Sequence, residues 1–377
     1  MSSKKGTLWE APPHTLAKVE MLRSYLRVWF VILGRTSGRR ELWYIDGFAG
    51  PGEYLNHAEG SPVAAIRAAE AALAVVSDRI GAVHCVFIEE NRRRFEWLRD
   101  RLKREPPSSP KIKCHPIHGT FVEGMTELRS SPENPFTRSA PTFAFLDPFG
   151  PEGLPFESVK ELLSRPGCEV LINLDSDGVG RILKAGEWAN HRELLNLTFG
   201  GDDWERELHA DMPLHVAVVK VVDLYKRKLR FLPNVDYCFS FEMRSAGNSF
   251  DYHLVFASQH KLGLEKMKEV MKRIDQTGSY CFSDGNINQA LLFRDSDVTS
   301  QIDRVARHFA KQTVTYEQVN DFVLNETGFT KAKQALTPLE REGRVTVITG
   351  AADRKRFTFP DRCTDDMRVQ FGEVPDA

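Results

Sequence analysis

The chain alternates short apolar runs with longer amphipathic ones. Apolar residues at three- and four-residue spacing from Leu16 to Leu33 predict a helix over 14–33. Short apolar runs, separated by helical stretches, then predict five strands, at 41–46, 83–89, 111–117, 142–147 and 168–174. Strands that alternate with helices in this way are typical of βαβ units. The expected fold class is therefore α/β, with a mostly parallel sheet.

The pattern changes after the fifth expected strand. From 177 to 232 it is helical and rich in Trp and Leu, which predicts an insertion or cap over the crevice of the sheet. Apolar runs at 235–243 and 251–257 predict an antiparallel pair that closes the sheet, and a helix should follow at 261–274.

The last part of the chain has a different character. Short helices are expected at 316–324 and 330–342, followed by strands at 344–348 and 356–359 around a turn at 350–353. Helix, helix, hairpin is the order of a winged helix. We therefore expect four parts: an N-terminal helical segment (1–39), a Rossmann-like domain (40–280), a winged-helix domain (300–360) and a disordered tail (361–377).

Composition restricts the function classes only in part. The 377 residues carry a formal net charge of −1, with a pI of about 6.8, so any nucleic-acid binding must come from local patches. The six cysteines include no Cys-x-x-Cys pair, which argues against a zinc ribbon or iron–sulfur site and fits a reducing compartment. The N-terminus has no apolar signal core, and the run Val28–Leu33 is too short to span a bilayer. We expect a cytoplasmic protein with no membrane association.

The most informative local pattern is a strand that ends in an acid and enters a glycine loop. The loop is not Gly-x-Gly-x-x-Gly and lacks Gly-Lys-Ser/Thr, which argues against dinucleotide and P-loop sites. An acid before Gly-Phe-Ala-Gly-x-Gly resembles motif I of S-adenosylmethionine-dependent methyltransferases. The alternative is an ordinary strand-to-loop turn. By the resemblance, the methionine end of the cofactor would lie against Asp46, Gly47, Phe48, Ala49, Gly50 and Gly52.

Two further strand ends supply candidates for the same cofactor. Glu89 and Glu90 end the second strand, where an acid commonly binds both hydroxyls of a ribose; alternatively, they stabilise the next helix through its dipole. Thr120 and Phe121 follow the third strand, where such folds contact adenine. Thr120 is also a candidate helix cap, with Glu123 three residues later completing a capping box.

The fourth strand ends in Asp147-Pro148-Phe149-Gly. In amine methyltransferases an Asp-Pro-Pro-Tyr/Phe turn orients the target, and this chain has the acid, one proline and an aromatic residue one place early. We therefore predict Asp147, Pro148 and Phe149 as catalytic residues, with an ordinary strand-terminal turn as the alternative. Lys18 lies one helical turn after His14 on the N-terminal helix and is a further cofactor-binding candidate.

Candidates also occur beyond the cofactor motifs. Asn173, Asp175 and Asp177 follow the fifth strand and could shape the target pocket; Asp-x-Asp suggests a metal, but no matching cluster is evident, so no metal site is predicted. The basic residues at 92–104 are interpreted as a solvated helix face. In the expected winged helix, acidic residues are interspersed with the basic ones, so the basic patch is modest. The candidates for nucleic-acid contact are Lys331, Lys333, Arg354, Lys355 and Arg356.

Taken together, these motifs resemble the three-Cys-motif partner protein (TcmP) family. The resemblance rests on His-Thr-x-x-Lys, Tyr-Ile-Asp-Gly-Phe-Ala-Gly-Pro-Gly, Gly-Ser-Pro-x-x-Ala, Phe-Leu-Asp-Pro-Phe-Gly and Tyr-His-Leu-Val-Phe-Ala-Ser, and covers nearly the whole chain. It implies a methyltransferase-like fold and a neighbouring partner protein with the three-cysteine motif, but no particular substrate.

The leading hypothesis is an S-adenosylmethionine-dependent methyltransferase acting on a base or nucleoside in flipped or single-stranded nucleic acid, RNA or DNA. The alternative is a non-catalytic partner subunit that keeps the fold and binds another protein or nucleic acid. A small-molecule methyltransferase whose last domain serves in dimerisation is a third hypothesis.

Overall fold

The computed structural model describes residues 7–35, 41–137, 140–150, 152–184, 190–209, 211–245, 250–275, 280–284, 295–349, 354–360 and 367–373. The chain divides into two compact units, one formed by residues 1–266 and 281–288 and the other by residues 267–280 and 289–377. The division falls within one helix, so the second unit begins earlier in the sequence than the expected boundary at 300. Within the described residues, no helix has the length and apolar character needed to cross a membrane.

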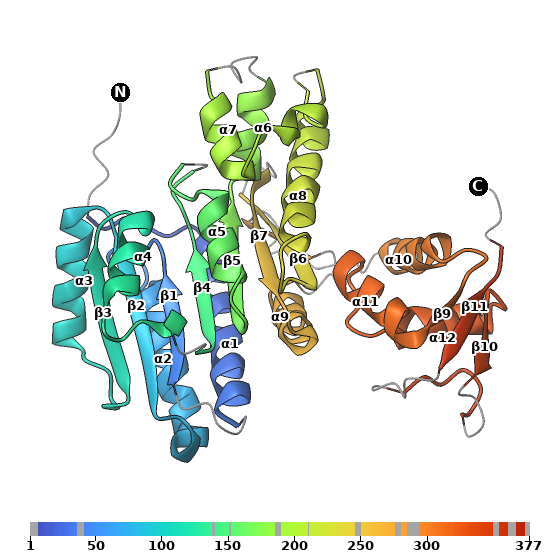
Figure 1. Cartoon of the computed structure of the whole chain (residues 1–377), viewed down its shortest axis with the longest axis horizontal. Helices are drawn as coiled ribbons and strands as arrows, with labels where there is room; N and C mark the ends of the chain where they lie inside the picture. The colour runs from blue at the N-terminus through green and yellow to red at the C-terminus, as the bar shows by residue number, and fades with distance from the viewer. Residues whose placement is uncertain are drawn as a thin grey trace. The chain divides into compact units, whose positions relative to one another are not determined.

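The first unit is built on one sheet with the strand order β3-β2-β1-β4-β5-β7-β6-β8 (Figure 1). The first five strands are parallel, β7 runs antiparallel between β5 and β6, and β8 pairs with β6 in parallel. The expected Rossmann-like sheet closed by an antiparallel pair is confirmed. The strands are β1 Glu41–Asp46, β2 Ala82–Glu89, β3 Ile112–His118, β4 Thr142–Leu146, β5 Cys168–Leu174, β6 Tyr237–Arg244, β7 Phe250–Ser258 and β8 Cys281–Ser283.

Helices cover both faces of this sheet. Because successive side chains of a strand point to opposite faces, Trp43 and Ile45 of β1 join a core with α4, α5, α7 and α8. Tyr44 stacks on Phe143 on the other face, where Tyr25 of α1 also packs. The helices of the first unit are α1 Pro13–Arg35, α2 Ser61–Val76, η1 Ser77–Arg79, α3 Arg92–Arg104, α4 Phe121–Ser130, η2 Pro135–Thr137, α5 Phe156–Leu163, α6 Ser176–Lys184, α7 Arg192–Phe199, η3 Asp203–Arg206, α8 Leu214–Arg230 and α9 Lys261–Ile274, which continues into the second unit.

The segment 177–232 is helical, as the pattern predicts. Its helices contribute to the core of one sheet face, where Phe199 of α7 and Tyr225 of α8 pack with Phe156 of α5. Figure 1 shows α6, α7 and α8 grouped together. None of the described residues of this segment lines the two site cavities presented below.

The second unit has the element order helix, strand, helix, helix, strand, strand around its own apolar core. Its sheet is antiparallel with the order β10-β11-β9. Thr315 caps α11 through a capping box with Gln318. The elements are α10 Asp295–His308, β9 Thr313–Thr315, α11 Tyr316–Glu326, α12 Lys333–Arg341, β10 Val345–Thr349 and β11 Arg368–Phe371.

One expected strand of this unit is wrong. Residues 356–359 contain a turn, and Phe359 is buried in the core as an irregular segment. The strand that pairs with β10 is β11, inside the expected tail, and it lies between the other two. Its alternation of exposed Arg368 and Gln370 with buried Val369 and Phe371 is strand-like but covers only four residues. The expected turn at 350–353 lies outside the described residues.

Candidate functional site

Two cavities lie at the carboxyl ends of the parallel strands. The first, called here the Asp147 cavity, has a volume of about 260 Å³ and is lined by Asp147, Lys18, Asn173 and the glycine loop. The second, the Glu89 cavity, has a volume of about 380 Å³ and is lined by Glu89, Glu90, Arg94 and Phe121, among others. Phe48 and Phe149 line both cavities, which are therefore adjacent. Open α/β sheets bind their ligands at this edge.

Glycine is required in this loop for two reasons, backbone conformation and close packing. Gly50 has φ +62° and Gly52 has φ +83°, in the left-handed region that costs other residues about 1–2 kcal/mol. At Gly47 the demand is packing, since an added Cβ would lie 2.8 Å from the Phe121 ring. A Cβ on Gly50 would meet only Trp9, at 3.8 Å. Of these three glycines, Gly50 is thus the one that leaves open space beside the loop.

Glu89 connects the glycine loop to the end of β2. Its carboxylate accepts hydrogen bonds from the backbone N–H of Gly50 (2.8 Å) and of Asn91 (2.7 Å). The side chain is 4% exposed, and burial raises the pKa of Glu89, against the effect of the two N–H donors and Arg94. Asn91 caps α3, so this carboxylate also stabilises the start of the helix. Both interpretations of Glu89 therefore fit the geometry, while Glu90 lines the same cavity as an exposed residue.

Asp46 does not occupy the position that the motif suggests. It is fully buried and lines neither cavity. Its carboxylate accepts a hydrogen bond from the hydroxyl of Tyr44 (3.0 Å) and a longer one from the N–H of Phe48 (3.4 Å). Burial raises the pKa of Asp46 to about 7, although a hydrogen bond from Ser61 opposes the shift. Direct ligand contact, expected for Asp46, is therefore replaced by support of the loop from beneath.

Lys18 and Asp147 both line the Asp147 cavity. The Lys18 ammonium, on α1, donates to Asp147 Oδ2 at 2.6 Å. The Asn173 amide, on β5, donates to Asp147 Oδ1 at the same distance. Lys18 is 5% exposed, and its ammonium lies 5.0 Å from the centre of the Tyr252 ring. Side chains from α1 and β5 thus fix one carboxylate at the end of β4.

One polar atom at this cavity lacks a partner. Asn173 Oδ1 is buried and, within the described part of the chain, accepts no hydrogen bond. A buried amide oxygen without a donor costs about 1–3 kcal/mol, so a ligand N–H or O–H group there would be favoured. Asn173 was a candidate for the target pocket, and it lines the Asp147 cavity.

Pro148 and Phe149 line the Asp147 cavity next to the acid. Phe149 is 59% exposed, and the guanidinium of Arg94 lies 4.6 Å from the centre of its ring. An aromatic ring exposed at the junction of two cavities can stack on a planar ligand group.

Some of the remaining candidates line a cavity, and others make contacts that stabilise the fold. Thr120 forms the expected capping box with Glu123 and lines neither cavity, while Phe121 lines the Glu89 cavity and stacks on Phe48. His14 lies 2.8 Å from Asp284. Asp175 lines the Asp147 cavity and accepts from the N–H of Gly178 (2.8 Å), whereas Asp177 pairs with Arg181 on α6.

Several lining residues carried no recognisable motif. The Asp147 cavity is also lined by Trp9, Thr15, Tyr54 and Tyr252. Tyr252 belongs to a segment that was predicted as a strand and cited for the family resemblance, without a site role, and Trp9 precedes the first helix. An isolated aromatic residue has no spacing that would distinguish a cavity wall from ordinary core.

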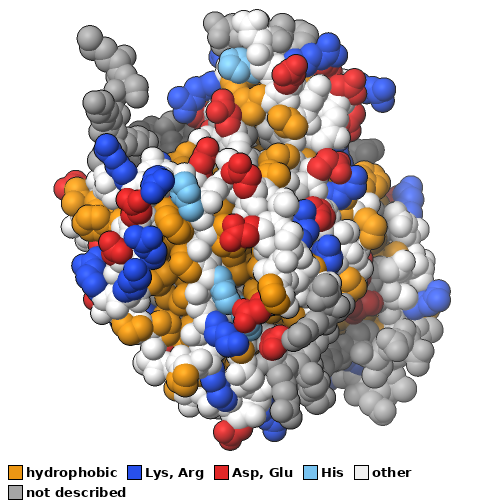
Figure 2. Space-filling model, turned by 60° about the vertical axis from the view of Figure 1, so that its left-hand side comes forward, with side chains coloured by type: hydrophobic (Ala, Val, Ile, Leu, Met, Phe, Trp, Pro, Cys, Tyr) orange, Lys and Arg blue, Asp and Glu red, His pale blue; other side chains and the backbone are white. Residues whose placement is uncertain are grey.

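The basic candidates of the second unit differ in their exposure to solvent. Arg354 is 10% exposed at its side chain and forms an ion pair with Glu340 of α12, with one N···O distance of 3.0 Å. Arg354 thus has a structural contact, and its nucleic-acid contact stays a prediction. Lys331 and Lys333 are half-buried, whereas Lys355 and Arg356 are exposed. Figure 2 shows Lys and Arg interspersed with Asp and Glu over the face that it presents, without a continuous basic surface.

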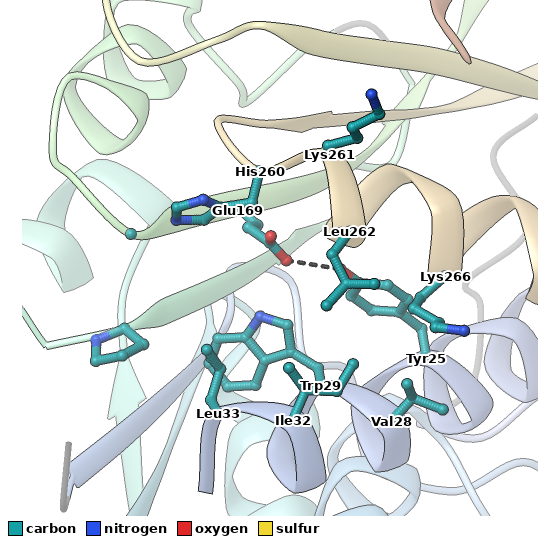
Figure 3. Close-up of a pocket in the computed structure, with 13 residues that line it drawn as sticks. Tyr25, Val28, Trp29, Ile32, Leu33, Glu169, His260, Lys261, Leu262 and Lys266 are labelled. Carbon is teal, nitrogen blue, oxygen red and sulfur yellow. Dashed lines mark hydrogen bonds between the residues drawn. The ribbon is translucent and has the colours of Figure 1, made fainter. Parts of the chain in front are cut away.

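A third cavity, of about 440 Å³, lies at the opposite edge of the first sheet, where β4 and β5 begin. Trp29, Ile32 and Leu33 of α1 line one side of it (Figure 3). Its buried acid, Glu169, accepts hydrogen bonds from the hydroxyls of Tyr25 (2.6 Å) and Ser258 (2.8 Å).

Comparison with known proteins gave only distant likenesses of structure. No family model and no curated protein matches the chain, so the resemblance to the three-Cys-motif partner protein family stays a prediction. Trm1 from Pyrococcus horikoshii with S-adenosyl-L-methionine aligns over 98% of this chain and 93% of its own (11% identity, TM-score 0.42). An O-methyltransferase from Bacillus cereus in complex with SAH aligns over 66% and 82% (12% identity, TM-score 0.35). A precorrin-6y C5,15-methyltransferase from Geobacter metallireducens aligns over 61% and 86% (13% identity, TM-score 0.28). Likenesses this distant carry no conclusion about activity, which must be inferred from the site.

Proposed function

We propose that the chain is an S-adenosylmethionine-dependent methyltransferase. The observation that carries the proposal is the buried Glu89 carboxylate, which holds the glycine loop through the N–H of Gly50 and lines the cavity at the carboxyl edge of the sheet. Five carboxylates line the two cavities (Glu53, Glu89, Glu90, Asp147 and Asp175), against three cationic side chains (Lys18, Arg92 and Arg94). This balance disfavours a pyrophosphate and favours a ligand with hydroxyl groups and a positive charge.

The two cavities suit the two ends of this cofactor. Glu89 and Glu90 would bind the ribose hydroxyls, and Phe121 would contact the adenine. At the other end, the unpaired Asn173 Oδ1 would accept a hydrogen bond from the ammonium group. When bound, the cofactor supplies an electrophilic methyl group.

The residues of the Asp147 cavity orient the methyl acceptor. Each oxygen of Asp147 accepts one hydrogen bond from the protein and keeps capacity for one more. Asp147 can therefore accept from an N–H or O–H of the acceptor, while the hydrogen bond from Lys18 fixes the direction of the carboxylate. Tyr54 and Tyr252 line the same cavity and restrict water.

The acceptor we propose is a base or nucleoside in nucleic acid, flipped out or single-stranded. The exposed ring of Phe149 offers a stacking surface at the entrance. We assign the second unit, with its α11, α12 and β10–β11 pair, to a winged helix, which would give exposed Lys355 and Arg356 a nucleic-acid role. Phosphate contacts by these residues should make binding dependent on salt.

Calorimetric titration with S-adenosylmethionine tests the cofactor. We expect one site with a micromolar Kd, about −8 kcal/mol. Glu89→Gln should weaken binding about tenfold or more because it removes a charged acceptor. Glu123→Gln, in the capping box of α4 outside both cavities, is the matched control and should bind as the wild type does. No heat and no thermal shift at millimolar ligand would contradict the proposal.

Transfer of labelled methyl groups to RNA and DNA tests the acceptor. Asp147→Asn should abolish transfer while cofactor binding remains. The double variant Lys355→Ala/Arg356→Ala should reduce the salt dependence of nucleic-acid binding, by about one unit of slope per lost phosphate contact. Arg99→Ala/Lys103→Ala on α3 removes the same charge as a control. Cofactor binding without any transfer, with retained binding of a three-cysteine neighbour protein, would favour the non-catalytic subunit instead.

A further inference from the structure

Three potential metal ligands converge on one face of the sheet, away from both site cavities. His84 lies on β2, His115 on the neighbouring strand β3, and Glu133 in the turn that follows α4. His84 Nδ1 and His115 Nε2 are 3.1 Å apart, and Glu133 Oε2 lies 3.7 Å from the first and 3.5 Å from the second. Because Glu89 is five residues further along β2, the cluster lies about 16 Å from the cofactor edge.

These distances match the edges of a metal coordination polyhedron. Zinc bonds of 2.0–2.2 Å in a tetrahedron separate neighbouring ligand atoms by about 3.3–3.6 Å. The three measured separations, 3.1, 3.5 and 3.7 Å, bracket this value. Two imidazole nitrogens and one carboxylate oxygen leave the fourth position to water, as in open zinc sites.

Hydrogen bonds within the cluster do not engage all three side chains. One imidazole N–H can be shared between His84 and His115, but Glu133 Oε2 is then beyond hydrogen-bond distance of both rings. The shared proton occupies the facing positions of both rings, so neither nitrogen is left to donate to the carboxylate. A cation at the centre would instead be bonded by all three groups.

The surroundings fix the first ligand and leave the others accessible. The His84 ring is 2% exposed and stacks on Trp43 with centroids 4.0 Å apart and an interplanar angle of 9°. The side chains of His115 and Glu133 are 29% and 48% exposed, so an ion can enter from solvent. Nitrogen ligands favour zinc and similar transition ions over magnesium or calcium.

We propose that His84, His115 and Glu133 form a binding site for a divalent transition ion of the zinc class. The ion fastens the turn after α4 to β2 and β3 and so stabilises the helix that begins at Phe121. The inference does not depend on the proposed methyltransferase activity. Sequence alone did not show the cluster, because the pairing of β2 with β3 and the return of the turn bring the residues together.

Titration of the chelator-treated full chain with Zn²⁺ tests the site. We expect one equivalent to bind with a Kd of about 1 μM or tighter and to raise Tm. His115→Ala, at a half-buried position, and Glu133→Gln, at an exposed one, should weaken binding about 100-fold or more and abolish the Tm shift. His57→Ala removes an exposed histidine elsewhere and should change neither the Zn²⁺ affinity nor the Tm shift. Unaltered Zn²⁺ binding in His115→Ala would mean that other residues, such as cysteines, bind the ion, and would overturn the proposal.

Trp43 provides a second readout that is specific to this place. Cu²⁺ bound by His84 should quench the Trp43 fluorescence, because the two rings are in van der Waals contact. In Trp43→Phe, Cu²⁺ should still bind with one equivalent, but the saturable quenching should disappear. Quenching that persists in Trp43→Phe, or absence of any saturable Zn²⁺ uptake at 100-fold excess, overturns the proposal.

Discussion

The two edges of the first sheet each hold a cavity and a buried acid, yet they differ in how that acid is satisfied. At the amino edge, Glu169 accepts from the side chains of Tyr25 and Ser258, and a hydrogen bond from Trp29 also stabilises its charge. At the carboxyl edge, Glu89 accepts hydrogen bonds from two backbone N–H groups and lies 3.9 Å from the Arg94 guanidinium, and Asn173 Oδ1 has no partner among the described residues.

The comparison shows that cavity size does not identify the site. The amino-edge cavity is the larger, about 440 Å³ against 260 and 380 Å³. Its acid is already satisfied by the protein, so a ligand would gain little by contacting it. The carboxyl edge keeps an unpaired acceptor and a fixed Lys18–Asp147 pair facing open space, which is the arrangement expected of a site prepared for a ligand.

The largest expected effect is a difference in methyltransferase activity between variants at the two sheet edges. Lys18 and Tyr25 both lie on α1, one at each edge. Lys18→Met leaves the Asp147 carboxylate without its ammonium partner and should lower kcat/KM for methyl transfer about 10³-fold, or about 4 kcal/mol. Tyr25→Phe should keep kcat/KM within about twofold. Equal losses in both variants would remove the functional distinction between the edges.

The next effect concerns the buried acid beneath the glycine loop. Asp46 has a pKa of about 7 in the folded protein, raised by burial, against about 3.9 when unfolded. Between these values the folded state retains a proton that the unfolded state has lost, so the free energy of unfolding falls as pH rises and levels off above pH 7. We expect a loss of about 2–3 kcal/mol between pH 5 and 8.

Asp46→Asn should remove this pH dependence, as measured by urea unfolding at both pH values. Burial also raises the pKa of Glu169, so Glu169→Gln should change the profile in the same direction. Glu157→Gln, at an exposed carboxylate, serves as the control. A difference between Asp46→Asn and wild type that is independent of pH would mean that Asp46 is ionised throughout.

The hydrophobic pattern of the sequence predicted the positions of helices and strands better than it predicted the contacts between them. The strand 41–46 was predicted with its observed bounds because it is apolar and flanked by breaks, and so was 168–174. The strand at 356–359 was wrong, since two aromatic residues in a short segment suggest a strand as readily as a buried loop. The four residues of β11 alternate correctly, but such a short run is easily lost in an apparent tail.

The site was predictable as a set of strand ends but not as a set of partners. Lys18 donates to Asp147, 129 residues later, and no local spacing encodes such a pair. Asp46 was expected at the ligand because the motif ends in an acid, whereas only the packed structure shows it sealed beneath the loop. Glu169 gave no recognisable pattern, because an acid within an apolar run resembles the solvent-facing position of a strand.

The third prediction concerns stability at the amino edge. Tyr25→Phe removes a donor from the buried Glu169 and should lower the free energy of unfolding by about 1–2 kcal/mol. Tyr54→Phe at the carboxyl edge is the matched control, since its hydroxyl makes no hydrogen bond within the described residues, and should cost less than about 0.5 kcal/mol. Urea unfolding measures both. If the two variants unfold alike, the Tyr25–Glu169 bond contributes nothing.

The smallest effect tests whether the glycine loop serves the ligand or only the fold. Gly50 and Gly343 both have positive φ, +62° and +74°, and neither has a neighbour that would obstruct a Cβ. Alanine at either position should lower the free energy of unfolding by about 1 kcal/mol through backbone strain. Only Gly50→Ala should also weaken S-adenosylmethionine binding, because its N–H holds Glu89 and its Cβ would enter the Asp147 cavity. Calorimetry of both variants compares the two losses, and equal affinities would assign the left-handed turn at Gly50 to folding alone.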